Sequence, residues 1–289
     1  MNTIRIAAAA TLIEALLGTG LSRTKIKQLV KYRAIRVDGV AATRPDQPVQ
    51  AGMVVTIASE KENTDPYPPC PGLPIVYEDQ DIVVLDKPAG LLTIASASEK
   101  DRTVYATMRR CLAKRPGGGT IFILHRLDQG VSGLLVLAKT EAARDTLRAT
   151  WSQVEQRFLA LVEGRPEAME GTVHSMLRES KAHRVYSLRP GEGGGKPAKT
   201  GYRVLRCGEE SALVELVPMT SRKNQLRVHM SDLGHPVVGD KKYGAATNPL
   251  RRMALHASFI RFPHPTTGEP MTLHLDPPSG FNILAATPV

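Results

Sequence analysis

The sequence has few aromatic residues and few cysteines, and it has no long hydrophobic run. Aromatic residues make up 4% of its 289 residues, so a surface that stacks many single-stranded bases is not predicted. Its three cysteines, Cys70, Cys111 and Cys207, lack the short spacing of a zinc or redox motif, and we expect reduced thiols. Without a run of membrane length or a signal-peptide cleavage pattern, we expect a cytoplasmic protein with no membrane partner.

A nucleotide-binding or methyl-donor fingerprint is also missing. The glycine-rich segment 191–196, GEGGGK, lacks the spacing of a phosphate-binding loop, and no buried strand precedes it. We interpret this segment as the tip of a hairpin. The sequence therefore predicts neither a cofactor nor a metal.

Positive charge is present in excess. The chain has 38 Lys and Arg residues against 28 Asp and Glu, which gives a formal net charge of +10. Cationic side chains displace the counterions of a phosphate backbone, so this balance favours a nucleic acid as partner. Charge alone is also compatible with a basic, solubilising surface, and it does not separate DNA from RNA.

Residues 8–60 are predicted to form a small N-terminal α/β domain. Ser22 can cap a basic helix, and the alternating run that follows centres on Asp38-Gly39, a dipeptide favoured in tight hairpins. Two short helices followed by a small hairpin sheet resemble the S4 RNA-binding domain. The RNA contacts that this resemblance implies are Arg23, Lys27 and Lys31. The alternative is a charged helical hairpin that only packs on the rest of the chain.

The remainder of the chain is predicted to be a second domain behind a linker. Residues 61–74 are rich in charge and proline and lack an apolar period, which is typical of a linker. Residues 75–289 contain many short β-like runs and a few helical stretches. This pattern predicts an α+β domain with a mixed, largely antiparallel sheet.

The most informative segment is 125–140, HRLDQGVSGLLVLAKT. A polar tetrad and a turn precede a hydrophobic strand, and such a loop can present a carboxylate to a cleft. The segment resembles the signature of the large-subunit ribosomal pseudouridine synthases of the RluA type. Segments 83–93, 157–164 and 225–244 agree with that family in order and spacing, so the resemblance extends well beyond four residues.

The resemblance implies a pseudouridine synthase fold and the cofactor-free isomerisation of uridine in RNA. Its essential residue falls on Asp128, which would attack C1′ as a nucleophile or remove the C2′ proton as a base. The family motif also places a cation at Arg227, which would pair with Asp128 and keep that carboxylate ionised. The alternative is that Asp128 is a turn residue and Arg227 a cation on a strand surface.

Four further residues are assigned to RNA or base contacts. Arg126 is expected to fill the gap left by a flipped nucleotide, with a phosphate contact as the alternative. Leu127 and Phe158 are assigned to the uridine, although the family usually has tyrosine at the position of Phe158, whose ring supplies no hydroxyl. Lys87 is expected on the cleft wall, either at an RNA phosphate or in solvent.

A second departure from the family lies in segment 220–227, TSRKNQLR, where many relatives read TGRTHQIR. Ser221 replaces a glycine and Asn224 a histidine.

The S4-type domain favours ribosomal RNA over transfer RNA, and we expect a monomer. The missing hydroxyl at Phe158 leaves an alternative, an RNA-binding or ribosome-assembly factor without turnover. A further alternative is an S4-containing methyltransferase, which would need a methyl-donor pocket.

Overall fold

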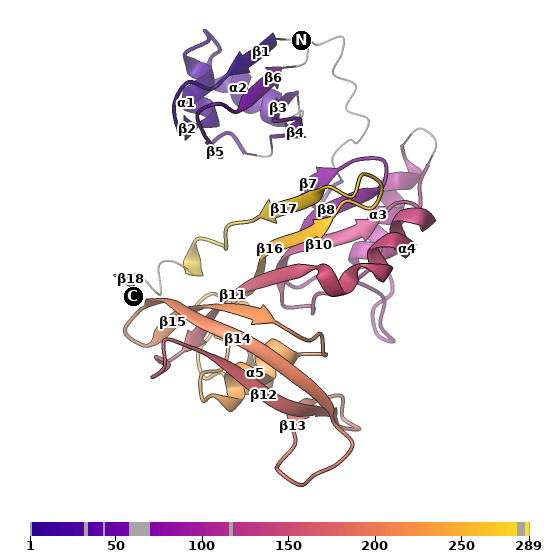
Figure 1. Ribbon diagram of the computed structural model, residues 1–289, viewed down its shortest axis with the longest axis vertical. Coiled ribbons are helices and arrows are strands. Elements are labelled where there is room, and N and C mark those ends of the chain that lie inside the picture. Colours follow the sequence, from indigo (N-terminus) through magenta and orange to yellow (C-terminus); the bar gives the residue numbers. More distant parts are fainter. Residues whose placement is uncertain are drawn as a thin grey trace. The chain divides into compact units, whose positions relative to one another are not determined.

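The computed structural model describes residues 2–31, 34–42, 44–57, 70–115, 118–281 and 287–288. The chain divides into two compact units, one made of residues 1–69 and 76–79 and the other of residues 70–75 and 80–289 (Figure 1). Segment 61–69 of the expected linker lies outside the described residues. No helix among the described residues is both long enough and apolar enough to span a membrane.

The first unit is a small antiparallel sheet with two helices. Its strands pair in the order β1-β6-β3-β4, and β2 pairs with β5. Asp38 and Gly39 both have positive φ, as the predicted tight hairpin between β3 and β4 requires. The elements are β1 (Asn2–Arg5), β2 (Ala10–Thr11), α1 (Leu12–Leu17), α2 (Arg23–Lys31), β3 (Ile35–Val37), β4 (Val40–Ala41), β5 (Pro48–Val49) and β6 (Val54–Ile57). Strand β1 lies ahead of the expected domain start at residue 8 and pairs with β6.

The local sequence explains both helices of this unit. Thr11 and Glu14 form a capping box at the start of α1, each side chain bonding the backbone N–H of the other. Leu12, Leu16 and Ile26 are fully buried, so the two helices share one apolar core. Burial of these side chains stabilises helices that are too short to persist alone.

The second unit is built on one large sheet, and strand β7 is hydrogen-bonded into this sheet next to β8. The strands are β7 (Ile75–Glu78), β8 (Ile82–Lys87), β9 (Phe122–Ile123), β10 (Ser132–Ala138), β11 (Glu155–Glu163), β12 (Glu170–Glu179), β13 (Val185–Ser187), β14 (Lys196–Cys207), β15 (Ser211–Pro218), β16 (Leu255–Pro263), β17 (Pro270–His274) and β18 (Thr287–Pro288). The helices are α3 (Val104–Ala113), α4 (Glu141–Ala149) and α5 (Gln225–Asp232), and the 3₁₀ turns are η1 (Trp151–Gln153) and η2 (Lys241–Tyr243).

The sheet order is β13-β12-β14-β15-β11-β16-β10-β8-β7, with β9, β17 and β18 attached to β10, β16 and β14. Among the described strands, β10 and β16 form the one parallel pair. Strand β16 thereby joins two halves of the sheet, with α5 packed on β12 to β15 and α4 on β9 and β10 (Figure 1). The predicted α+β class with a mixed, largely antiparallel sheet is confirmed.

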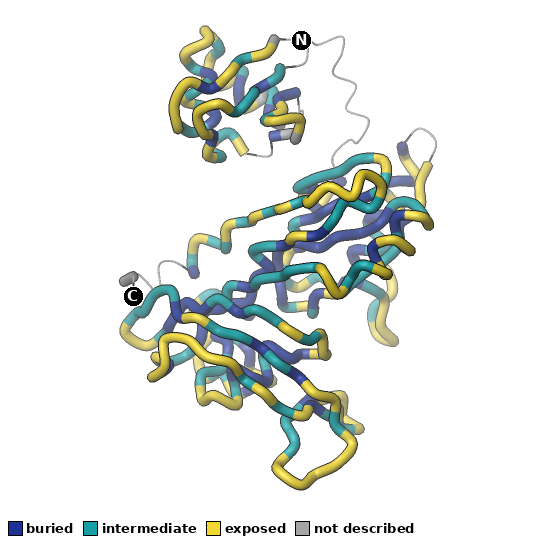
Figure 2. The backbone as a smooth tube through the Cα atoms, viewed as in Figure 1, coloured by how far each residue is buried: buried dark blue, intermediate teal, exposed yellow. Residues whose placement is uncertain are grey.

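The junction between β10 and β16 explains one glycine of the 125–140 segment. Gly133 has φ +109°, and a Cβ atom there would collide with the backbone of Ala257 in β16. All seven residues of β10 are buried, and buried residues follow the central strands in Figure 2. A glycine is therefore required where the two halves of the sheet meet.

Two sequence-based interpretations are corrected by the fold. Segment 191–196 leads from β13 into β14 and includes the first residue of β14, Lys196. Strands β13 and β14 flank β12 on opposite sides, so the segment does not form a hairpin tip. Cys70 and Cys111 form a disulfide, with their Cα atoms 5.7 Å apart, and are not reduced thiols. The separation of 41 residues does not indicate this pairing. The two cysteines meet because the first turn of the unit, at Cys70, folds back onto α3, which contains Cys111.

The disulfide is expected to stabilise the second unit. Closing a loop of 41 residues restricts the unfolded chain and raises the free energy of unfolding by about 3 to 4 kcal/mol. We expect Cys70→Ser combined with Cys111→Ser to lose that amount in urea denaturation under non-reducing conditions. Cys207→Ser, which changes the unpaired cysteine, is the control and should leave the midpoint in place. Equal midpoints for all three proteins would contradict the prediction.

Candidate active site

Asp128 and Arg227 meet across the sheet although 99 residues separate them. Asp128 lies in the loop between β9 and β10, and Arg227 lies in the first turn of α5. Arg227 Nη1 donates to Asp128 Oδ2 at 3.0 Å. The side chain of Asp128 is 33% exposed and that of Arg227 is 12% exposed. The site therefore holds a carboxylate that is accessible from solvent beside a nearly buried cation.

Arg227 is not a strand-surface cation, because three groups fix it in place. Its Nε and Nη2 donate to the two carboxylate oxygens of Asp240 at 2.6 and 2.8 Å, and Asp240 is 3% exposed. The guanidinium carbon lies 4.7 Å from the ring centroid of Tyr243. Asn224 Oδ1 accepts a further bond from Arg227 Nη1 at 3.0 Å. Bidentate pairing and stacking both use the planar shape of arginine.

Arg227 stays protonated although its side chain is nearly buried. Burial by itself lowers the pKa of Arg227, but the hydrogen bonds and charges of Asp240 and Asp128 outweigh it and raise the pKa above its ordinary value. Asp240, Asn224 and Tyr243 were not predicted as site residues. Asp240 and Tyr243 lie in the agreeing segment 225–244, whereas Asn224 stands where many relatives have histidine. The motifs alone do not say which polar residues converge.

Lys87 differs from both sequence-based interpretations. Its side chain is fully buried, so it lies neither in solvent nor on a surface that an RNA phosphate contacts. The ammonium donates to the carbonyl oxygens of Pro88, Leu91 and Gln129 at 3.0, 2.7 and 3.4 Å. Lys87 thereby ties the loop after β8 to the residue that follows Asp128.

The burial of Lys87 predicts a pH dependence of stability. Burial lowers the pKa of Lys87 from 10.5 to about 8, opposed in part by the charge of Asp128. Between these two pH values the unfolded chain keeps a proton that the folded chain has lost, so the free energy of unfolding rises with pH. The shift corresponds to about 3 kcal/mol across that window.

Urea denaturation of wild type and Lys87→Met at pH 7.5 and pH 10 measures this effect. We expect the stability of wild type relative to the variant to increase at the higher pH, since methionine does not titrate. A constant difference between the two proteins at both pH values would show that Lys87 does not titrate in this window. Other titrating groups are common to both proteins and cancel in the comparison.

The remaining residues of the tetrad differ in exposure. Arg126 is exposed, whereas Leu127 is 6% exposed and its backbone bonds Thr93 Oγ1 through both N–H and carbonyl. His125 Nε2 accepts from Val136 N at 3.0 Å, and burial lowers the pKa of His125 to about 4. A neutral histidine that binds β10 has a structural role.

Phe158 lies on β11 and is 7% exposed, within the same hydrophobic cluster as Leu127. Its cross-strand partners are Leu216 on β15 and Ala257 on β16. Both predicted uridine contacts are thus core side chains, with little surface open to solvent. In the first unit, Arg23 and Lys27 are exposed, while the side chain of Lys31 lies outside the described residues.

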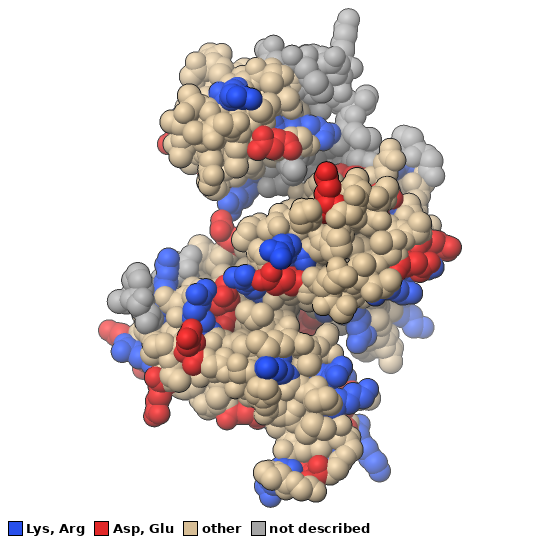
Figure 3. Space-filling model, viewed as in Figure 1, with Lys and Arg blue, Asp and Glu red and all other residues tan. Residues whose placement is uncertain are grey.

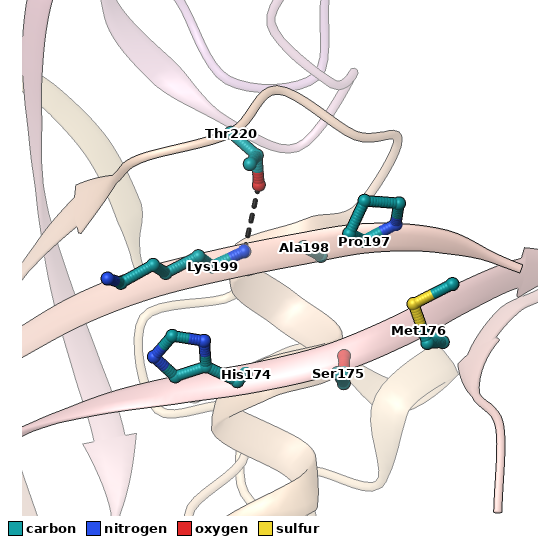
Figure 4. A pocket seen from close by; sticks show the side chains of 7 residues that line it. All are labelled: His174, Ser175, Met176, Pro197, Ala198, Lys199 and Thr220. Atoms are coloured by element: carbon teal, nitrogen blue, oxygen red, sulfur yellow. Dashed lines mark hydrogen bonds between the residues drawn. The ribbon is translucent and has the colours of Figure 1, made fainter.

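The second unit also has a pocket outside this site. It is lined by His174, Ser175, Met176, Pro197, Ala198, Lys199 and Thr220 (Figure 4). Ser175 bonds His229 of α5, so its neighbours His174 and Met176 point to the opposite face of the sheet. We assign no role to this pocket.

On the face seen in Figure 3, Lys and Arg of the second unit are interspersed with Asp and Glu.

A partly exposed carboxylate paired with a nearly buried arginine, on a sheet of this order, fits an RNA-modifying isomerase. Residues 81–232 match the family of RNA pseudouridylate synthases, and residues 11–55 match the S4 domain. The chain belongs to the RNA pseudouridylate synthase family. It is an RNA pseudouridine synthase of the RluA type with an N-terminal S4 domain that binds RNA, as predicted, and the methyltransferase alternative is wrong.

Among its relatives is the ribosomal large subunit pseudouridine synthase D of Vibrio vulnificus, which is 34% identical over 92% of this chain and 86% of the relative. The protein of the same name from Zymomonas mobilis is 34% identical over 73% of this chain and 71% of its own length. Among solved structures, human RNA pseudouridylate synthase domain containing 1 is 30% identical with a TM-score of 0.62. That alignment covers 75% of this chain and 89% of the human one.

Proposed function

We propose that this enzyme converts uridine to pseudouridine in large-subunit ribosomal RNA, with Asp128 acting on the nucleotide. The observation that carries the assignment is the exposed carboxylate of Asp128, held at 3.0 Å by Arg227. The substrate class is supported by the curated relatives, two of which are named as ribosomal large subunit enzymes. Transfer RNA is the competing substrate.

The proposed chemistry needs an ionised carboxylate at the sugar of a flipped uridine. Arg227 engages one oxygen of Asp128, and the exposed part of the carboxylate faces solvent, where a nucleotide would enter. The other oxygen of Asp128 either attacks C1′ and displaces N1 of the base, or removes the C2′ proton while the C1′–N1 bond breaks. In both routes the freed base turns and C5 bonds C1′. This step displaces Asp128 in the first route and returns the proton to C2′ in the second; the C5 proton is lost and N1 gains one, so the isomerisation is redox-neutral.

The substrate contacts are assigned by position. Exposed Arg126 takes the gap left in the RNA by the flipped nucleotide, since a planar guanidinium stacks well on neighbouring bases. The edges of Leu127 and Phe158 pack against uracil. Arg23, Lys27 and Lys31 of the S4 domain bind RNA phosphates.

The test is direct mapping of pseudouridine on unmodified RNA. Large-subunit ribosomal RNA and transfer RNA transcripts are incubated with wild type or Asp128→Asn, and carbodiimide-dependent reverse-transcription stops are recorded. We expect a new stop in the ribosomal transcript with wild type alone. A stop confined to transfer RNA would overturn the substrate assignment, and no stop in either would overturn the proposed function.

A further inference from the structure

Asn224 occupies an unusual place at the start of α5. It is 9% exposed and has φ 55° and ψ 15°, in the left-handed region that asparagine tolerates better than most residues. An asparagine before a helix usually caps the first backbone N–H groups with its side chain. Here the side chain makes no such bond. Its amide is therefore available for another purpose.

The amide of Asn224 bridges two residues that hold the site together. Its Oδ1 accepts from Arg227 Nη1 at 3.0 Å, and its Nδ2 donates to Tyr243 Oη at 2.9 Å. Tyr243 is 3% exposed, and its ring lies against the guanidinium of Arg227. Asn224 thus connects the hydroxyl of the ring to the guanidinium that the ring supports.

The bridge acts on the nitrogen that serves Asp128. Arg227 Nη1 has two hydrogens, and it donates to both Asp128 Oδ2 and Asn224 Oδ1. Nε and Nη2 are directed to Asp240. With Asn224 in place, both hydrogens of Nη1 have a fixed acceptor, and one of them is aimed at Asp128.

We propose that Asn224 is a positioning residue that orients Arg227 Nη1 towards the carboxylate of Asp128. This inference rests on the proposed roles of Asp128 and Arg227. The left-handed backbone is what allows one short side chain to reach both Arg227 and Tyr243. Without the amide, one hydrogen of Nη1 loses its acceptor and the hydroxyl of Tyr243 loses one of its donors. The guanidinium stays paired with Asp240, but its Nη1 is no longer held from the side opposite Asp128.

Two substitutions of Asn224 distinguish the effect of losing the amide from the effect of straining the backbone. Glycine removes the amide and accepts positive φ, whereas alanine removes the amide and is strained there. Single-turnover rates on saturating ribosomal RNA transcript are expected to fall about 30-fold for both, because small displacements of reacting groups have large effects on rate. The dissociation constant for RNA should stay within about twofold of wild type, since Asn224 is buried. Arg251→Gly, at an exposed residue with φ 53°, is the matched control and should keep the wild-type rate.

Tyr243→Phe tests the other end of the bridge. It removes the hydroxyl that accepts from Asn224 and leaves the ring beside Arg227. We expect a smaller fall in rate, about fivefold, and little further fall when it is combined with Asn224→Gly, because residues in one network are not additive. Full additivity of the two substitutions would overturn the bridge.

A second measurement needs no RNA and no activity. In the wild-type protein, NMR of the arginine side chains should show Nη1 hydrogens of Arg227 protected from exchange with solvent, and Asn224→Gly should lose this protection. Wild-type protection or a wild-type rate in Asn224→Gly overturns the inference. If wild type forms no pseudouridine, the proposed function fails, and the NMR result still decides whether Asn224 orients Arg227.

Discussion

Asp128→Asn is expected to lower the single-turnover rate of pseudouridine formation by about a thousandfold or more, with the dissociation constant for RNA little changed. Asparagine has the shape of aspartate and can still accept a hydrogen bond from Arg227. It can neither attack C1′ nor remove the C2′ proton, and acid–base or nucleophilic groups typically supply factors of about 10² to 10⁴. The measurement is pseudouridine formed per unit time at saturating enzyme.

The control for this substitution is Asp145→Asn, which changes an exposed aspartate on α4 that pairs with Arg144. Its rate should match wild type, and circular dichroism should show both variants folded. A rate for Asp128→Asn within about tenfold of wild type would mean that another group carries the chemistry. The choice between nucleophile and base is not decided by this variant, because asparagine removes both abilities.

Asp240→Ala is expected to have the largest effect on stability, because it leaves the buried guanidinium of Arg227 without its bidentate partner. Breaking a buried pair from one side costs about 3 to 5 kcal/mol of unfolding free energy. Activity should also fall by about a hundredfold or more, since a loose Arg227 no longer holds Asp128. Urea denaturation and single-turnover kinetics measure the two effects.

The chain contains a matched pair for this comparison. Arg144 Nε and Nη2 bond Asp145 Oδ1 and Oδ2 at 2.8 and 3.0 Å, with nearly the same bidentate geometry as Arg227 and Asp240. Asp145 is 63% exposed on its side chain, whereas Asp240 is 3% exposed. Asp145→Ala should therefore cost less than about 1 kcal/mol. Equal costs for both substitutions would show that burial does not set the strength of the Arg227 pair.

Sequence patterns predicted the α+β class, and they predicted a loop before a hydrophobic strand in segment 125–140. Both predictions depend only on residues that are close together in the sequence. Periodicity of two and short turns indicate strands, and Asp38-Gly39 predicts a hairpin by its backbone preference alone. The pairing of Asp128 with Arg227, which are 99 residues apart, was predicted from the family motifs, because no spacing in the sequence indicates it. Their side-chain roles stay predictions until the variants are measured.

Other features depend on contacts between distant segments, and sequence patterns did not reveal them. The pairing of Cys70 with Cys111 and the convergence of Asp240 with Arg227 both follow from the folded path of the chain. The burial of Lys87, by contrast, is indicated by a pattern in the sequence. Lys87 alternates with Val83 and Leu85, both fully buried, and shares their face of β8. A lysine at such a position indicates a buried ammonium, even though its charge favours the surface.

The position of β16 also determines when the site comes into existence. It lies between β11 and β10, so it joins the half of the sheet that bears α5 to the half that bears Asp128. Ser132 and His256, paired across this junction, are 124 residues apart. A ribosome adding about 5 to 20 residues per second needs on the order of ten seconds to make that stretch. A nascent chain that ends before Leu255 carries every motif but lacks the strand that joins the two halves of the sheet, and Ser132 and Gly133 of β10 do not yet have their partners in β16.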